Sequence, residues 1–165
     1  MAILEKECHG KKDILEDCVK DKFLEYWFSG FNKSIELLDD EAREKIFSEC
    51  GKACSDSYTK HIYIDEYNSS DSLKDFLDRL KTRFPEVSFK VIKDNEIIEL
   101  TYNFCACDLV KKEFITSPLM CDCSRQSLLY NWSSVFGEGK IEVELKQSIL
   151  EGKPNCKFLI YIKSD

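Results

Sequence analysis

The sequence has few histidines, prolines and glycines, with two, three and six of them among 165 residues. The scarce prolines and glycines form no linker between domains, and neither a low-complexity tract nor an internal repeat is present. A chain of this length is enough for one hydrophobic core, so we expect a single domain over residues 1–165. Within it, the pattern of residues 1–84 is typical of helices, and residues 85–165 are sheet-rich.

Other absences exclude classes of partner. No run of about 18 apolar residues is long enough to span a bilayer, and residues 1–18 lack the apolar centre of a secretory signal. The net charge of -7 gives no electrostatic attraction to nucleic acid or to an anionic membrane. Nine cysteines, an odd number without such a signal, argue against an extracellular disulfide framework. We therefore expect a cytoplasmic protein with reduced thiols.

Hydrophobic periodicity predicts the fold. Apolar residues at helical spacing predict helices over roughly residues 11–30, from Asp39 to Cys54 and over about 70–84. Strict alternation then predicts strands over 87–91, 98–107, 141–146 and 158–162, with a helix between the two hairpins that is capped by Ser124 and ends at Gly137 or Gly139. The order predicts an α+β fold, an antiparallel sheet of two hairpins with about four helices mainly on one face.

Two tight cysteine pairs, Cys105-Ala106-Cys107 and Cys121-Asp122-Cys123, are the most informative motif. In extended chain, residues i and i+2 point to the same side, so each pair can present two sulfurs to one point. Zinc accepts four thiolates tetrahedrally, and the pattern predicts a zinc site of Cys105, Cys107, Cys121 and Cys123. The C-x-C spacing is a weaker zinc signal than C-x-x-C, so unligated thiols remain the alternative.

Thiol chemistry leaves two further hypotheses open. Cys123 stands just before the expected helix start, where exposed N–H groups and the helix dipole favour a thiolate, so it is the best-placed nucleophile if the chain is an enzyme. His9 and His61 are not near a cysteine in sequence, and no phosphate loop or hydrolase signature is present. We expect a binding or sensor domain, with a thiol-dependent hydrolase or a redox sensor that oxidises a C-x-C pair as alternatives.

A third constellation, Cys50-Gly51-Lys52-Ala53-Cys54, places two thiols one turn apart on one helix face. Core packing is the simpler interpretation of that face. Glycine within a helix is destabilising by up to about 1 kcal/mol relative to alanine, which suggests that another backbone or a ligand approaches Gly51. Cys8 and Cys18 have no evident partner, and the role of Cys156 at the start of the last strand is open.

The C-terminal segment resembles a known family. The residues that carry the resemblance are Cys121-Asp-Cys-Ser124 before a helix, then Val143-Glu-Leu-Lys-Gln-Ser-Ile149, Gly152 and Cys156-Lys-Phe158, with Cys50 to Cys54 upstream. They resemble 4-vinyl-reductase-type domains, and more closely a group of uncharacterised prokaryotic proteins, some labelled L-2-amino-thiazoline-4-carboxylic acid hydrolase by homology. The resemblance covers residues 45–162 in scattered pieces.

The resemblance implies an α+β domain that encloses a pocket for a small, often hydrophobic molecule, in some relatives beside a structural zinc held by cysteines and a glutamate. In that pattern the second cysteine falls on Ser148 and the glutamate on Leu145, a departure that puts this type of zinc site in doubt. As residues that bind or border the ligand we expect Cys50, Cys54, Tyr102 and Trp132, with Trp27 and Phe47 as further wall residues, although each aromatic residue alone is typical of core packing. A small-molecule ligand and a possible homodimer are the expected partners.

Overall fold

The computed structural model describes residues 12–163, and their side chains from residue 22 onward. Cys8 and His9 lie outside the described residues, as does the side chain of Cys18. The elements, in chain order, are α1 (Lys12–Leu37), α2 (Asp40–Cys54), the π-helical turn η2 (Ser55–Thr59), α3 (Lys60–Asn68), α4 (Leu73–Arg83), β1 (Val87–Lys93), β2 (Ile97–Tyr102), α5 (Asp108–Lys111), the 3-10 turn η3 (Pro118–Met120), α6 (Cys121–Phe136), β3 (Ile141–Gln147), the 3-10 turn η4 (Ile149–Glu151) and β4 (Cys156–Ile162).

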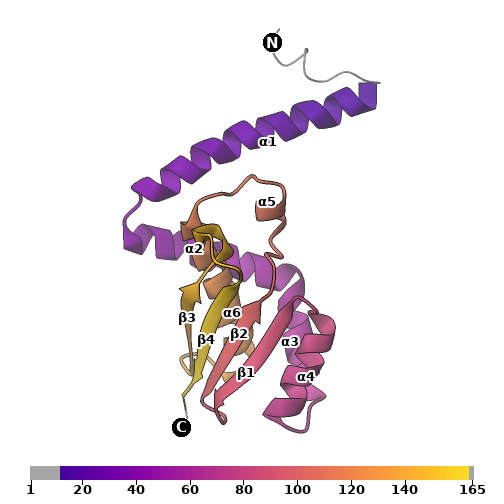
Figure 1. Ribbon diagram of the computed structural model, residues 1–165, viewed down its shortest axis with the longest axis vertical. Helices are drawn as coiled ribbons and strands as arrows, with labels where there is room; N and C mark the ends of the chain where they lie inside the picture. The colour runs from indigo at the N-terminus through magenta and orange to yellow at the C-terminus, as the bar shows by residue number, and fades with distance from the viewer. Residues whose placement is uncertain (1–11, 164–165) are drawn as a thin grey trace.

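The sheet has four strands in the order β1-β2-β4-β3, and all neighbours are antiparallel. The hairpins β1–β2 and β3–β4 are joined where β2 pairs with β4, with Ile98 opposite Ile160 and Leu100 opposite Phe158. Helices stack behind the sheet as Figure 1 is drawn. The predicted α+β fold, an antiparallel sheet of two hairpins, is therefore confirmed.

The core fills the space between the sheet and the helices. Trp132 and Leu128 of α6 and Phe76 of α4 are almost completely buried there. Fully burying each such side chain contributes about 1.5–3 kcal/mol to folding. The opposite sheet face carries charged side chains together with a few apolar ones, such as Leu159, and on it the Tyr161 hydroxyl donates to Glu144 over 3.0 Å. This division follows from the alternation that predicted the strands.

Close contact between α2 and α6 depends on Gly51. A Cβ atom there would lie 2.7 Å from the backbone nitrogen of Ser127 and 2.8 Å from the carbonyl oxygen of Cys123. The sequence predicted that another backbone or a ligand approaches this glycine, and the backbone of α6 does so. Further along the same helical run, the Ser55 hydroxyl lies 2.8 Å from that of Ser127.

Two boundaries differ from the prediction, and both affect cysteines. Strand β2 ends at Tyr102, so Cys105 and Cys107 are not in extended strand and the alternation argument does not apply to them. Helix α6 begins at Cys121 and not after Ser124, which puts Cys121 and Cys123 inside its first turn. Local sequence does not mark this start, because the residue before the helix, Met120, makes no side-chain cap.

Helix α1 lies over the segment that carries α5, apart from the helices behind the sheet (Figure 1). Asn32 joins the two: its side chain donates to the carbonyl oxygen of Phe114 over 2.8 Å and accepts from the N–H of Thr116 over 3.3 Å. The rings of Phe28 and Phe114 stack with centroids 5.3 Å apart. Among the helices of residues 12–163, none has the length and apolar character needed to cross a bilayer.

Candidate functional site

The seven cysteines whose side chains are described come together at one end of the sheet, although they belong to four separate segments. All seven are free thiols. Electrostatic interactions connect them in a continuous series, in which Cys123 interacts with Cys50, Cys54 and Cys107, and Cys105 interacts with Cys107 and Cys156. We call Cys50, Cys54, Cys107 and Cys123 the outer thiol group, and Cys105, Cys121 and Cys156 the inner thiol group.

The outer thiol group is largely open to solvent, and two of its thiols, Cys54 and Cys123, have a raised pKa. Cys50, Cys54 and Cys107 are exposed residues, and Cys123 is half-buried. Burial, and then the nearby thiols of Cys50, Cys54 and Cys107, raise the pKa of Cys123 to about 12. Burial of the sulfur also raises the pKa of Cys54. Burial and the neighbouring thiols therefore oppose the Cys123 thiolate that the helix start was expected to favour, because a surface helix dipole contributes only about 0.3–1 kcal/mol. Cys123 as a nucleophile stays a prediction.

The inner thiol group contains a hydrogen-bonded pair. The Cys121 thiol and the Cys156 sulfur share a hydrogen bond, and the Cys156 sulfur also accepts from the backbone N–H of Ile149 over 3.3 Å. The Ser148 hydroxyl forms a further hydrogen bond to Cys121. Both thiols of the pair are buried. This contact connects the first residue of α6 to the first residue of β4.

One proton is distributed unequally within that pair. The hydrogen bond from Cys121 and the N–H of Ile149 hold the pKa of Cys156 below its usual value, against the effect of burial. The same hydrogen bond, together with burial, raises the pKa of Cys121. Of the two thiols, Cys156 is therefore the one that loses its proton more readily, with Cys121 as the donor. Thiolates are the nucleophilic form of cysteine, so the lowered pKa makes Cys156 the better nucleophile of this pair.

Ser148 is positioned by the short turn that follows β3. Its hydroxyl accepts from the N–H of Glu151 over 3.2 Å, and the Glu151 carboxylate accepts from the N–H of Ser148 over 2.9 Å, a reciprocal capping box that starts η4. Ser148 is completely buried. The turn thus holds both the Ser148 hydroxyl and the Ile149 N–H against the inner thiol group. Cys156 and this turn were not among the predicted site residues.

The predicted zinc ligands share this region but do not form a coordination site as their side chains stand. Within residues 12–163, no group of three or more His, Cys, Asp and Glu side chains is placed to hold a metal ion. Where the resemblance implies a cysteine, the hydroxyl of Ser148 faces Cys121, and serine is not among the usual zinc ligands. Zinc bound by Cys105, Cys107, Cys121 and Cys123 stays a prediction.

The predicted ligand residues range from the exposed Cys50 and Cys54 to the buried Trp132. Tyr102 is close enough to Cys54 and Tyr63 for their charges to raise its pKa, although burial is the larger cause. The rings of Tyr63 and Trp132 have centroids 6.1 Å apart. Trp132 is completely buried, and its indole N–H interacts with the Tyr63 hydroxyl without forming a hydrogen bond of good geometry. Of the other aromatic residues proposed as pocket walls, Phe47 is buried and Trp27 is exposed.

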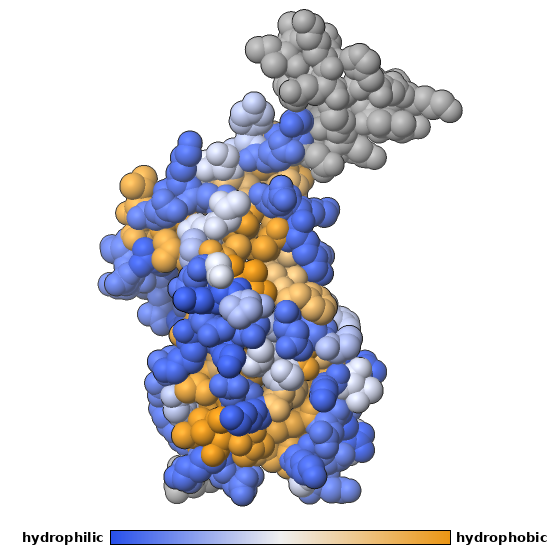
Figure 2. Space-filling view, viewed as in Figure 1, coloured by the Kyte–Doolittle hydropathy of each residue, from blue (hydrophilic) through white to orange (hydrophobic). Residues whose placement is uncertain are grey.

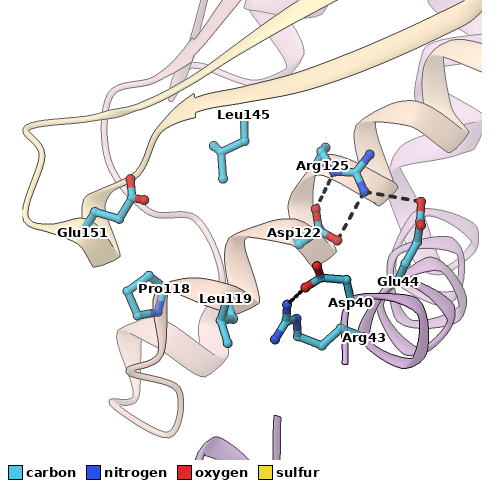
Figure 3. A pocket seen from close by; sticks show the side chains of 9 residues that line it. All are labelled: Asp40, Arg43, Glu44, Pro118, Leu119, Asp122, Arg125, Leu145 and Glu151. Atoms are coloured by element: carbon cyan, nitrogen blue, oxygen red, sulfur yellow. Dashed lines mark hydrogen bonds and ion pairs between the residues drawn. The ribbon is translucent and has the colours of Figure 1, made fainter. Parts of the chain in front are cut away.

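An open groove of about 400 Å³ is lined by residues of α2, the η3 turn, the start of α6, β3 and the η4 turn (Figure 3). Its arginines are already paired. Arg125 binds Asp122 and Glu44, and Arg43 binds Asp40. Four carboxylates therefore face two guanidinium groups, and the groove has an excess of negative charge. The residues that line it are Asp40, Arg43, Glu44, Pro118, Leu119, Asp122, Arg125, Leu145 and Glu151.

Comparison with known proteins identifies no family. No protein-family model matches the chain, and no curated protein sequence matches it. Among solved structures, the chain is similar to a trafficking protein particle complex subunit 3 from Naegleria fowleri, covalently bound to palmitic acid. That similarity has a TM-score of 0.48 and 12% sequence identity, and covers 88% of this chain and 96% of that one. A likeness of this size carries no inference about function.

Proposed function

We propose that the chain is a thiol redox sensor domain in which Cys156 and Cys121 are the reacting pair. The hydrogen-bonding interaction between the two side chains is the observation that carries the proposal, because it places the two thiols near each other, as a disulfide requires. Low-pKa thiols beside a second, resolving thiol are typical of redox-sensing cysteines. The sequence suggested oxidation within a C-x-C pair; the contact between Cys121 and Cys156 favours a pair from two distant segments instead.

The chemistry requires a two-electron oxidant, for which a peroxide is the simplest class. The Cys156 thiolate attacks one peroxide oxygen, so that the S–O bond forms, the O–O bond breaks and hydroxide leaves. The Cys121 sulfur then attacks the sulfenic sulfur of Cys156, the S–S bond forms, the S–O bond breaks, and the departing hydroxide takes the thiol proton as water. The two sulfurs together lose two electrons and the peroxide gains two.

Oxidation of this pair would change the turn beside it. A disulfide removes the negative charge on Cys156, and with it the acceptor that the N–H of Ile149 uses. It also removes the thiol that hydrogen-bonds Ser148. Both groups belong to the η4 turn, whose Glu151 lines the acidic groove. Oxidation would therefore be signalled by a change in the position of the η4 turn, and of its Glu151, in the acidic groove.

Peroxide oxidation followed by peptide mapping tests the proposal. With alkylation of the remaining thiols, we expect the Cys121–Cys156 cross-link to be the dominant disulfide, because these two side chains interact and the pKa of Cys156 is lowered. Cys156→Ser should abolish it, and the matched control Cys50→Ser should not. The proposal would be contradicted if the dominant disulfide were Cys105–Cys107, Cys121–Cys123 or Cys50–Cys54. Irreversible oxidation without any disulfide would contradict it as well.

A second candidate function, binding of a small aromatic molecule, is supported by Trp132. The Trp132 N–H has only a poorly aligned interaction with the Tyr63 hydroxyl, and a buried N–H without a good acceptor costs about 1–3 kcal/mol. A ligand with a hydroxyl or carbonyl oxygen would recover part of that free energy. In the Trp27→Phe variant Trp132 is the sole tryptophan, since the chain has two. We expect phenol to change the emission of this variant saturably and to raise its melting temperature. A linear, non-saturating response would contradict binding in the core.

A further inference from the structure

Two glycines lie inside long helices, and they differ in their surroundings. The backbone of α6 occupies the space beside Gly51, where a Cβ atom would have contacts of 2.7 and 2.8 Å. A Cβ atom at Gly30 of α1 would meet nothing within 4 Å. Glycine destabilises a helix interior relative to alanine, and packing compensates this only at Gly51. Gly30 has the same opening for a second helix, and within the described chain nothing fills it.

The face of α1 around Gly30 is apolar and exposed. At 100° per residue, seven positions from 23 to 37 fall within about 60° of Gly30, and every one of these residues is exposed. Phe23, Tyr26 and Leu37 are 64%, 75% and 86% exposed, large fractions for apolar side chains. Apolar residues also gather over α1 and the segment below it in Figure 2. The seven residues of this outer face are Phe23, Tyr26, Trp27, Gly30, Lys33, Ser34 and Leu37.

The opposite face of α1 is the one that contacts the rest of the chain. Ile35 is buried on it, Phe28 stacks on Phe114, and Asn32 bonds the backbone of the α5 segment. These positions lie about 140–160° from Gly30 around the helix. If α1 rotated so that its outer face turned inward, these contacts would break. The outer face therefore stays exposed within one chain.

When two copies of α1 pair antiparallel and cross at Gly30, the outer face of one copy is complementary to the outer face of the other. Phe23 stands seven positions before Gly30 and Leu37 seven positions after it, so in an antiparallel pair of α1 helices crossing at Gly30 each Phe23 meets a Leu37. The same symmetry sets Trp27 opposite Lys33, a cation–π pair, because these two are three positions on either side. Self-complementary contact of this kind is what a two-fold dimer requires.

We propose that the outer face of α1 binds α1 of a second copy of this chain, antiparallel, with the two-fold axis at Gly30. The pair gives Gly30 the close helix contact that Gly51 already has, and it covers the exposed aromatic side chains. The proposed interface is independent of the thiol chemistry, because residues 22–37 include no cysteine.

Light scattering of the full chain in reducing buffer, from about 1 to 200 μM, tests the dimer. We expect the mass to rise from 19.3 kDa to about twice that value over this range. Phe23→Glu and Gly30→Leu should each weaken association by tenfold or more, the first by placing charge in the interface and the second by filling the crossing point. Ile92→Glu, a control at an exposed apolar residue of β1, should leave it unchanged.

A photo-cross-linker distinguishes this geometry from others. With benzoylphenylalanine at position 26 and mixed light and heavy-isotope chains, we expect inter-chain cross-links to residues 33–37. Cross-links to 23–30 would indicate a parallel pair and overturn the proposal. A chain that is monomeric throughout, or a dimer that survives Phe23→Glu and dissociates with Ile92→Glu, would overturn it as well. So would a monomer whose α1 face binds lipid vesicles instead.

Discussion

At pH 7, Cys156 is expected to react with methyl methanethiosulfonate about a hundred times faster than Cys123. With a pKa of about 12, Cys123 is a thiolate in only about one molecule in 10⁵ at this pH, whereas Cys156 has a pKa below that of a free thiol. Thiolate nucleophilicity falls with pKa, with a Brønsted coefficient of about 0.4–0.5, which offsets roughly half of that advantage on a logarithmic scale. Residue-resolved mass spectrometry of quenched samples measures both rates.

The pH dependence separates the cause of this reactivity from simple exposure. Because a lowered pKa keeps Cys156 ionised to lower pH, its rate should persist below neutrality, while that of Cys123 falls tenfold per pH unit. Cys121→Ala removes the main hydrogen-bond donor, raises the pKa of Cys156 and should slow its reaction about tenfold near pH 5.5. Cys121→Ser keeps a donor and should preserve most of the profile. An identical profile in Cys121→Ala would show that the hydrogen bond does not activate Cys156.

Gly51→Ala is expected to lower the free energy of unfolding by about 2 kcal/mol. The new methyl group would lie 2.7–2.8 Å from backbone atoms of α6, which cannot move away as a flexible side chain could. Overfilling a well-packed contact costs about 1–3 kcal/mol, and the better helix propensity of alanine returns at most about 1 kcal/mol. Urea unfolding followed by the emission of Trp132 measures the change. Gly51→Leu should not fold.

Gly30→Ala is the matched control for this prediction. The same substitution in the middle of α1 meets open space, so only the helix propensity changes, and the free energy of unfolding should rise by up to about 1 kcal/mol. The measurement is made at low micromolar concentration, where the proposed dimer is dissociated. Two substitutions of the same kind then shift stability in opposite directions. Equal effects would mean that α2 and α6 do not meet at Gly51 as described.

Several elements could be predicted because their cause is local. Asp39 was expected at the start of the second helix, and its carboxylate accepts from the N–H of Ala42 over 2.8 Å. Alternation placed Ile98 and Leu100 on one face of a strand, and both are completely buried. Gly137 ends α6 with a φ of 104°, a conformation that favours glycine. Each depends on residues a few positions apart.

Other boundaries depend on residues far away in the chain. The segment Ser55–Thr59 contains weak helix formers, yet the helical run continues through it, because Ser55 bonds Ser127 and Thr59 bonds Asn131 of α6. Packing on α6 therefore overrides local propensity. Similarly, periodicity continued β2 beyond Tyr102, but the strand ends there.

The sequence by itself determined the fold class, the buried stripes and the importance of cysteine, because these follow from composition and from spacing along the chain. Only the tertiary structure decided which thiols meet. Cys121 and Cys156 are 35 positions apart, and their contact depends on the pairing of β4 with its neighbours, on where α6 begins and on the η4 turn. The protonation of a thiol is set by what surrounds it in space, so the reactive cysteine could not be identified from its sequence neighbours.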